Sequence, residues 1–238
     1  IDRPIILARQ VTDVAACGNL AYFLKQDGSL WATGLPSSDK RPQRVADGPI
    51  RMAVGDTGVV LFVKEDGSLW SIGAGWARTL GTGHKEPRTK PFRIEPKDVI
   101  DVSIYGNNAV YLKDDGTAWG MGENRRADLG LGHNREVLKP EQLSIDGRST
   151  DSVADVWTVG AHTLILTEDG QLWGMGDNYY RQLQRDPRYF NNPNQSLRRK
   201  YGLREWPAIP VRLFKDRTVT QASGNGACNR GAGSADGT

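Results

Sequence analysis

Cysteine, histidine and long apolar runs are scarce in this sequence. Its two cysteines, Cys17 and Cys228, are too few for a disulfide framework, although one bridge between them remains open. The three histidines, His84, His133 and His162, do not form the close pairs that zinc sites use, so we expect no metal site. No apolar run approaches the roughly 20 residues of a spanning helix, which excludes a transmembrane helix.

Glycine, proline and tryptophan are plentiful, with 28, 12 and 7 residues in a chain of 238. Many tight turns joined by short strands with large aromatic anchors suit an all-β architecture. The chain opens on Ile1 rather than Met and has no signal-peptide pattern, so we interpret it as a processed form or a fragment.

An eight-residue pattern, Asp-Gly-x-x-Trp-x-x-Gly, occurs four times at intervals of about 40 to 55 residues. An Asp-Gly pair between two apolar runs predicts a type I′ hairpin turn, in which glycine supplies the positive φ. We expect the four tryptophans to occupy one blade position and to pack between blades. The repeated residues are Asp27, Gly28 and Trp31; Asp66, Gly67 and Trp70; Asp115, Gly116 and Trp119; and Asp169, Gly170 and Trp173.

Each turn stands among segments of strand length, as the second unit illustrates. An apolar run at 59–63 precedes the turn, a further strand at 50–54 precedes that run, and a proline-led strand at 42–45 comes first in the unit. Four short antiparallel strands per unit predict a β-propeller, whose blades stack face to face around an axis. A β-sandwich also has regular strand spacing, but it does not predict a recurring turn-Trp-Gly unit.

Two segments resemble a known family. Residues 122–133, Gly-Glu-Asn-Arg-Arg-Ala-Asp-Leu-Gly-Leu-Gly-His, look like the hallmark loop of the regulator of chromosome condensation repeat, and Gly-Ala-His-Thr at 160–163 looks like its strand signature. The resemblance implies a propeller, usually of seven blades. This sequence has four clear repeats and a degenerate fifth at 219–238, so we expect residues 1–238 to be one propeller domain or part of a larger ring. A five-bladed ring completed by the N-terminal strand is the alternative.

Catalytic groups are hard to assemble from this sequence. Cys17 has no evident base to activate it, and the aspartates of the Asp-Gly pairs belong to hairpin turns rather than to a glycosidase pair. The glycine-rich segments do not open a helix after a strand, as a phosphate loop would. We therefore expect no catalytic residue, no cofactor and no enzymatic activity.

Charge is uneven along the chain. Residues 177–206 hold seven basic and three acidic side chains among several aromatic ones, in a chain whose formal net charge is +3. This composition is typical of interface hot spots and of anion-binding or nucleic-acid-binding surfaces, and its alternative is a solvated rim loop. The candidate partner-binding residues are Arg181, Arg185, Arg188, Tyr189, Arg198, Arg199, Lys200, Arg204 and Trp206 in this insertion, with Trp76, Arg78 and Trp157 outside it.

These observations favour a non-enzymatic platform that binds another protein, preferably through an acidic surface of that partner. The resemblance implies a regulator of a small GTPase or of another enzyme, but no partner-engaging residue matches by motif. One alternative is a carbohydrate-binding lectin, which requires an exposed aromatic side chain once per blade. The other is nucleic-acid or chromatin binding through the basic insertion. The oligomeric state is left open.

Overall fold

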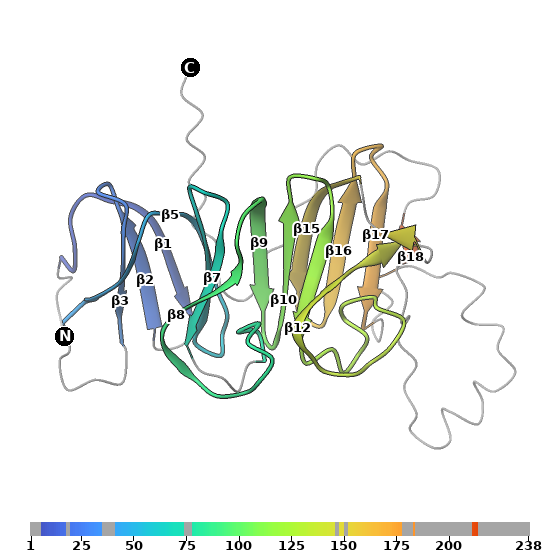
Figure 1. Ribbon diagram of the computed structural model, residues 1–238, viewed down its shortest axis with the longest axis horizontal. Coiled ribbons are helices and arrows are strands. Elements are labelled where there is room, and N and C mark those ends of the chain that lie inside the picture. Colours follow the sequence, from blue (N-terminus) through green and yellow to red (C-terminus); the bar gives the residue numbers. More distant parts are fainter. Residues whose placement is uncertain are drawn as a thin grey trace, which may run out of the picture.

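The computed structural model describes residues 6–17, 20–34, 41–73, 78–145, 148–149, 152–177, 183 and 211–213. Within these residues the chain forms four antiparallel sheets of four strands each, side by side in Figure 1, and a two-stranded ribbon. The strands are β1 (Val11–Cys17), β2 (Leu20–Lys25), β3 (Ser29–Thr33) and β4 (Gln43–Asp47); β5 (Pro49–Val54), β6 (Val59–Lys64), β7 (Leu69–Gly73) and β8 (Arg88–Glu95); β9 (Val99–Tyr105), β10 (Asn108–Lys113), β11 (Ala118–Gly122) and β12 (Val137–Gln142); the ribbon β13 (Ser144–Ile145) and β14 (Arg148–Ser149); and β15 (Val153–Val159), β16 (His162–Thr167), β17 (Leu172–Gly176) and β18 (Val211–Leu213).

Each sheet is a meander in which consecutive strands pair, and we number the sheets as blades 1 to 4. The first strand of each blade contacts the first strand of the next, from β1 to β5, β9 and β15. Sheets that meet along their first strands and diverge toward their fourth form a β-propeller, so the predicted fold class is confirmed. No described helix is long and apolar enough to cross a membrane.

The predicted order of strands within a blade is wrong in one respect. The proline-led strand was expected to come first in each unit, but β4 pairs with β3 and β8 pairs with β7. It is therefore the outermost strand of the blade formed by the preceding residues. Sequence spacing does not show which of the two neighbouring blades this strand joins, because the linkers on both sides of the strand are short.

The Asp-Gly turns also differ from the prediction. The glycines have positive φ, from 73° at Gly67 to 76° at Gly116, but the aspartates before them do not. A type I′ turn needs positive φ at both central residues. Instead, the amide of Gly67 donates to the carbonyl of Lys64, and the amide of Lys64 donates to that of Ser68. This is a three-residue loop closed by a left-handed glycine.

The four repeated tryptophans occupy equivalent positions on the third strands, as predicted. Each lies opposite a large apolar residue of the second strand: the pairs are Phe23 with Trp31, Phe62 with Trp70, Tyr111 with Trp119, and Ile165 with Trp173. Cross-strand pairs of this kind stabilise a sheet and fix its register.

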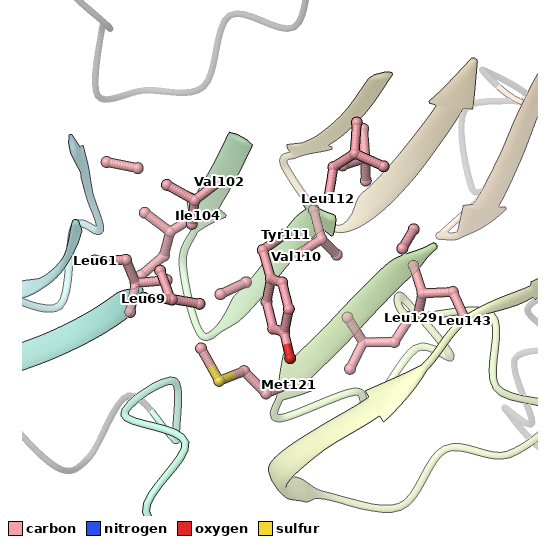
Figure 2. Packing of buried hydrophobic residues seen from close by; sticks show 14 of the residues in the cluster. Leu61, Leu69, Val102, Ile104, Val110, Tyr111, Leu112, Met121, Leu129 and Leu143 are labelled. Atoms are coloured by element: carbon pink, nitrogen blue, oxygen red, sulfur yellow. The ribbon is translucent and has the colours of Figure 1, made fainter. Parts of the chain in front are cut away.

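The core lies between blades. One buried cluster joins blade 1 to blade 2, and a larger one joins blades 2, 3 and 4. Figure 2 shows part of the larger cluster, with Leu61 and Leu69 of blade 2 facing Ile104 and Tyr111 of blade 3. We call the contact between blades 1 and 2 the first seam, and the two that follow the second and third seams.

Candidate binding surface

A hydrogen-bonded relay fixes each repeated tryptophan of the first three blades. In blade 2, Asp66 accepts hydrogen bonds from the amide and hydroxyl of Ser68, and the Ser68 hydroxyl accepts one from Trp70 Nε1 at 2.7 Å. The hydrogen bonds from Ser68 hold the pKa of Asp66 below its ordinary value. The same relay joins Asp27, Ser29 and Trp31 in blade 1 and Asp115, Thr117 and Trp119 in blade 3.

The faces of these tryptophan rings are not free. The ammonium of Lys25 lies 5.6 Å from the ring centroid of Trp31, and equivalent lysines lie over Trp70 and Trp119. In blade 4, Trp173 is 8% exposed. A lectin that stacks sugars on one aromatic ring per blade would need those faces open, so this arrangement disfavours it.

The hallmark loop is a self-contained hydrogen-bonded unit. Asn124 is fully buried, and its Nδ2 donates to the carbonyls of His133 and Arg135 while its Oδ1 accepts from the amide of Leu129. Because one side chain closes both ends of the loop, the loop's conformation depends on asparagine at this position.

Asp128, in the same loop, is buried with an incomplete set of partners. Its Oδ2 accepts a hydrogen bond from Asn108 Nδ2 at 3.1 Å, whereas Oδ1 has no hydrogen-bond partner among the described residues. Burial raises the pKa of Asp128 to about 6. His162 is the first residue of β16 in blade 4, and burial lowers its pKa.

Ion pairs join the blades across the second and third seams. Arg78 of blade 2 contacts Glu123 and Glu136 of blade 3, and Arg126 of blade 3 contacts Asp177 of blade 4. Glu123 and Asp177 are equivalent, because each directly follows a third strand and its amide donates to a carbonyl of the preceding hairpin. The second and third seams therefore each have an arginine–carboxylate ion pair, and its acidic residue directly follows the third strand of a blade.

Two of the predicted partner-binding residues fall on described parts of the chain. Arg78 is only 19% exposed and is engaged in the second seam. Trp157 is 8% exposed and packs in a core cluster with Leu166 and Leu172. Sequence spacing placed Trp157 off the tryptophan pattern but carried no information on its burial, because inward and outward positions alternate along a strand.

The other predicted contacts lie outside the described residues, and their binding roles stay predictions. They are Trp76, Arg181, Arg185, Arg188, Tyr189, Arg198, Arg199, Lys200, Arg204 and Trp206. The degenerate fifth repeat at 219–238 and Cys228, one of the two cysteines, fall outside as well.

No metal-binding arrangement of three or more His, Cys, Asp or Glu occurs among the residues that the structure describes. His84 is exposed beside Glu86, and His133 Nε2 lies 3.4 Å from Glu141. Both histidines belong to loops that the repeat places at matching positions.

A basic surface on blade 2 was missed by the sequence analysis. On the outer strand β8, Arg88, Lys90 and Arg93 have no ion-pair partner among the described residues, and Lys64 on β6 has none either. Arg88 lies over the ring of Phe92 at 5.1 Å, and Arg93 lies over Trp70 at 6.0 Å. The three basic residues within 88–93, without an acidic one among them, were the signal that could have revealed it.

Comparison with known proteins agrees with this architecture. The family model of the Regulator of chromosome condensation (RCC1) repeat matches residues 158–182. The fold is similar to that of human WBSCR16, with a TM-score of 0.64 and 21% identity over 83% of this chain and 50% of that one. It is also similar to Prp20p from Saccharomyces cerevisiae, with a TM-score of 0.68 and 20% identity over 87% of this chain and 52% of that one.

A second structure of Prp20, bound to Kap60, gives the same TM-score of 0.68 with 19% identity over 87% of this chain and 50% of that one. No curated protein matches the sequence. The chain spans about half the length of the solved structures that it resembles. The repeat match and the shared blade architecture together show a β-propeller in which residues 158–182 match the regulator of chromosome condensation repeat.

Proposed function

We propose that this chain is a non-enzymatic propeller that binds another protein and regulates it. The observation that carries the proposal is the blade architecture shared with Prp20p, a protein with reported binding to Gsp1p and histones. Propellers use a rigid ring of sheets to present loops and strand edges to a partner, and the seam ion pairs of this chain support such a frame.

The absence of enzymatic activity is part of this proposal. The polar side chains that stand out by their repetition serve turns and seams: Asp66 and Ser68 hold a hairpin, and Arg78 and Glu123 join two blades. These roles account for groups that would otherwise be candidate acids and bases. The finer proposal is that the bound partner is a small GTPase or another enzyme whose activity the propeller changes.

The test starts with crosslinking of the full chain in its source cells, followed by mass spectrometry and reconstitution with each purified protein that is captured. Isothermal titration calorimetry should give saturable binding at a defined stoichiometry. We expect the double variant Arg198→Ala/Arg199→Ala to weaken this binding, because the sequence predicts a basic partner-binding insertion there. If the insertion is an exposed loop as predicted, the urea midpoint should stay nearly unchanged, because exposed charges contribute little to stability. The matched control is Arg51→Ala/Arg135→Ala, which removes two exposed arginines from blades 2 and 3.

Three outcomes separate the alternatives. Binding of a purified protein with the stated variant effect supports the proposal and its basic insertion. Unchanged binding by the double variant keeps the protein-binding propeller but moves its surface elsewhere. Saturable binding on a glycan array, together with no protein that binds after purification, would overturn the proposal in favour of a lectin.

A further inference from the structure

Blades 2 and 3 carry the same aromatic pair on the outer half of the sheet. The rings of Phe62 and Trp70 are stacked with centroids 6.5 Å apart and planes at 7°. Those of Tyr111 and Trp119 are stacked at 6.4 Å and 7°. The two blades can therefore be compared group by group.

In blade 3 a lysine lies over the tryptophan and is neutralised from the neighbouring blade. Lys113 Nζ is 5.0 Å from the Trp119 centroid and 2.9 Å from Glu95 Oε2, and Glu95 is the last residue of β8 in blade 2. The Tyr111 hydroxyl donates to the other oxygen of Glu95 at 2.8 Å. The second seam thus contains a carboxylate held by an ammonium and a phenol, with both charged side chains only 18% exposed.

In blade 2 the same lysine is present but the carboxylate is not. Lys64 Nζ lies 4.8 Å from the Trp70 centroid. Ala46 lies opposite Leu30, the residue before the blade 1 tryptophan, which is the register position that Glu95 has opposite Leu69 in blade 2. Ala46 and Trp70 both pack against the core cluster that contains Phe62. Phenylalanine replaces Tyr111 here, so the group that bound the carboxylate's second oxygen is missing together with the carboxylate.

The third seam lacks the lysine. Thr167 occupies the position of Lys113 in blade 4, since each pairs with the first residue of its blade's inner strand. That seam has no ammonium to neutralise. The first seam alone, among the three described, keeps the cation over its tryptophan without an acid from the neighbouring blade. The turn aspartate Asp66 does not distinguish the two blades, because Lys64 interacts electrostatically with Asp66 just as Lys113 does with Asp115.

The surroundings of Lys64 add further positive charge. Arg93 lies opposite Trp70 and its guanidinium is 6.0 Å from the ring centroid, whereas blade 3 has Gln142 at that position. Further along the same outer strand, Arg88 and Lys90 also have no ion-pair partner among the described residues. Lys64 of β6 and Arg93 of β8 lie over one aromatic ring, and β8 carries two further cations. Together they form a basic surface with no ion-pair partner among the described residues.

We propose that Lys64, Trp70 and Arg93, named here the Trp70 surface, bind a carboxylate of an acidic peptide segment in a partner protein. The carboxylate takes the place over the first seam that Glu95 takes over the second. The shortness of Ala46 leaves that place to an incoming side chain. Arg88 and Lys90 contact further acidic residues of the same segment along β8. Charge-assisted hydrogen bonds beside an aromatic face are among the stronger contacts that such a segment can make.

This inference rests on the proposed function, because it names the chemistry of the partner that a protein-binding propeller recognises here. We prefer a carboxylate to a phosphate because a carboxylate of this chain, Glu95, already binds at the equivalent position of the second seam. There it contacts a lysine beside an aromatic pair of the same geometry. A nucleic acid is the alternative occupant, and the test includes it.

The probe is a short fluorescein-labelled peptide that alternates Glu with Gly, titrated with the full chain and followed by fluorescence anisotropy. We expect binding that weakens as NaCl is raised, and at least about tenfold weaker binding of the matched peptide with Gln in place of Glu. Lys64→Gln/Arg93→Gln should lose about tenfold in affinity. The matched control Lys97→Gln/Arg135→Gln removes one lysine and one arginine elsewhere on blades 2 and 3 and should change affinity little.

A second pair of variants tests the position itself. Ala46→Glu places a carboxylate of the chain where Glu95 stands in the next seam, so it should compete with the peptide and weaken its binding as strongly as the double variant. Ala46→Gln has nearly the same size without the charge and should retain binding. Circular dichroism and a urea midpoint show which variants are folded, and Lys64→Gln/Arg93→Gln decides the matter if Ala46→Glu does not fold.

Equal affinity for the Glu and Gln peptides would overturn the inference, and so would equal effects of Lys64→Gln/Arg93→Gln and its control. Binding of a single-stranded DNA oligonucleotide at this surface, without binding of the peptide, would overturn it as well. If a purified protein partner binds the wild-type chain while Lys64→Gln/Arg93→Gln leaves its affinity unchanged, the inference fails and the proposed function stands. If no purified protein binds the wild-type chain, the proposed function fails instead.

Discussion

The guanidinium of Arg126 donates to Asp177 Oδ2 at 2.9 Å across the third seam, joining the hallmark loop of blade 3 to the residue that follows the third strand of blade 4. Arg126 is 42% exposed and Asp177 13%. The pair connects residues 51 positions apart in the chain, so it acts on the packing of two blades rather than on either sheet.

A double-mutant cycle on Arg126→Ala and Asp177→Ala should give a coupling free energy of about 0.5 to 1 kcal/mol in urea unfolding, since solvent screens the exposed guanidinium. Arg125→Ala in the same loop is the control. Its side chain is 73% exposed, and we expect a change within about 0.5 kcal/mol. A coupling free energy of zero would mean that the ion pair does not hold the seam.

Asp128 makes stability depend on pH. Its pKa rises from 3.8 to about 6 in the folded protein, so its contribution to stability is fully present below about pH 3.8 and is lost as the pH rises through about 6. Asp128→Asn stays neutral at every pH. Relative to the wild type, we expect this variant to gain up to about 3 kcal/mol in the free energy of unfolding between about pH 4 and about pH 7.5, measured by urea titration.

Asp115→Asn is the control with the opposite sign. The hydrogen bonds from Thr117 lower the pKa of the exposed Asp115, so its contribution is present above its ordinary pKa and is lost as the pH falls through the lowered value. Asp115→Asn should therefore lose stability relative to the wild type at neutral pH, and the difference should shrink in acid. A common trend for both variants would contradict the assignment of Asp128.

Ser68→Ala should destabilise the protein by about 1 kcal/mol or more, because the variant leaves Trp70 Nε1 without its acceptor and Asp66 without its hydroxyl donor. Ser68→Thr copies the relay that Thr117 forms in blade 3 and should stay within about 0.5 kcal/mol of the wild type. The urea midpoints of the two variants decide this, and equal losses would show that the site responds to volume rather than to the hydrogen bonds.

Trp119→Ala should cost about 3 kcal/mol, the lower end of the range for large aromatic residues, because the ring is only partly buried but stacks on Tyr111 and packs against the largest core cluster. Trp119→Phe keeps an aromatic ring and loses the donor to Thr117, so about 1 kcal/mol is expected. Chemical denaturation measures the free energy of unfolding of both variants. A loss below about 1 kcal/mol for Trp119→Ala would show that the ring contributes little to the seam.

Several features followed from local sequence alone. The Asp-Gly-x-x-Trp pattern predicted the hairpin and the Trp-bearing strand after it in each blade, because a glycine of positive φ must end the hairpin loop and a large aromatic residue must pair across it. The four-stranded repeat and the fold class followed from the same periodicity. The turn type could not be predicted in this way, because hairpins with two-residue loops and hairpins with three-residue loops can both contain Asp-Gly.

Only the tertiary structure decided which blade each outer strand joins, where Trp157 is buried, and which cations lack a partner. Lys64 and Lys113 occupy the same position of the repeat, and the sequence around them is nearly interchangeable. They differ because Glu95 reaches Lys113 from the neighbouring blade, whereas Ala46 occupies the register position of Glu95 in the first seam. A repeat pattern describes contacts within a blade, whereas charge balance at a seam depends on residues from two blades, and these are brought together by packing alone.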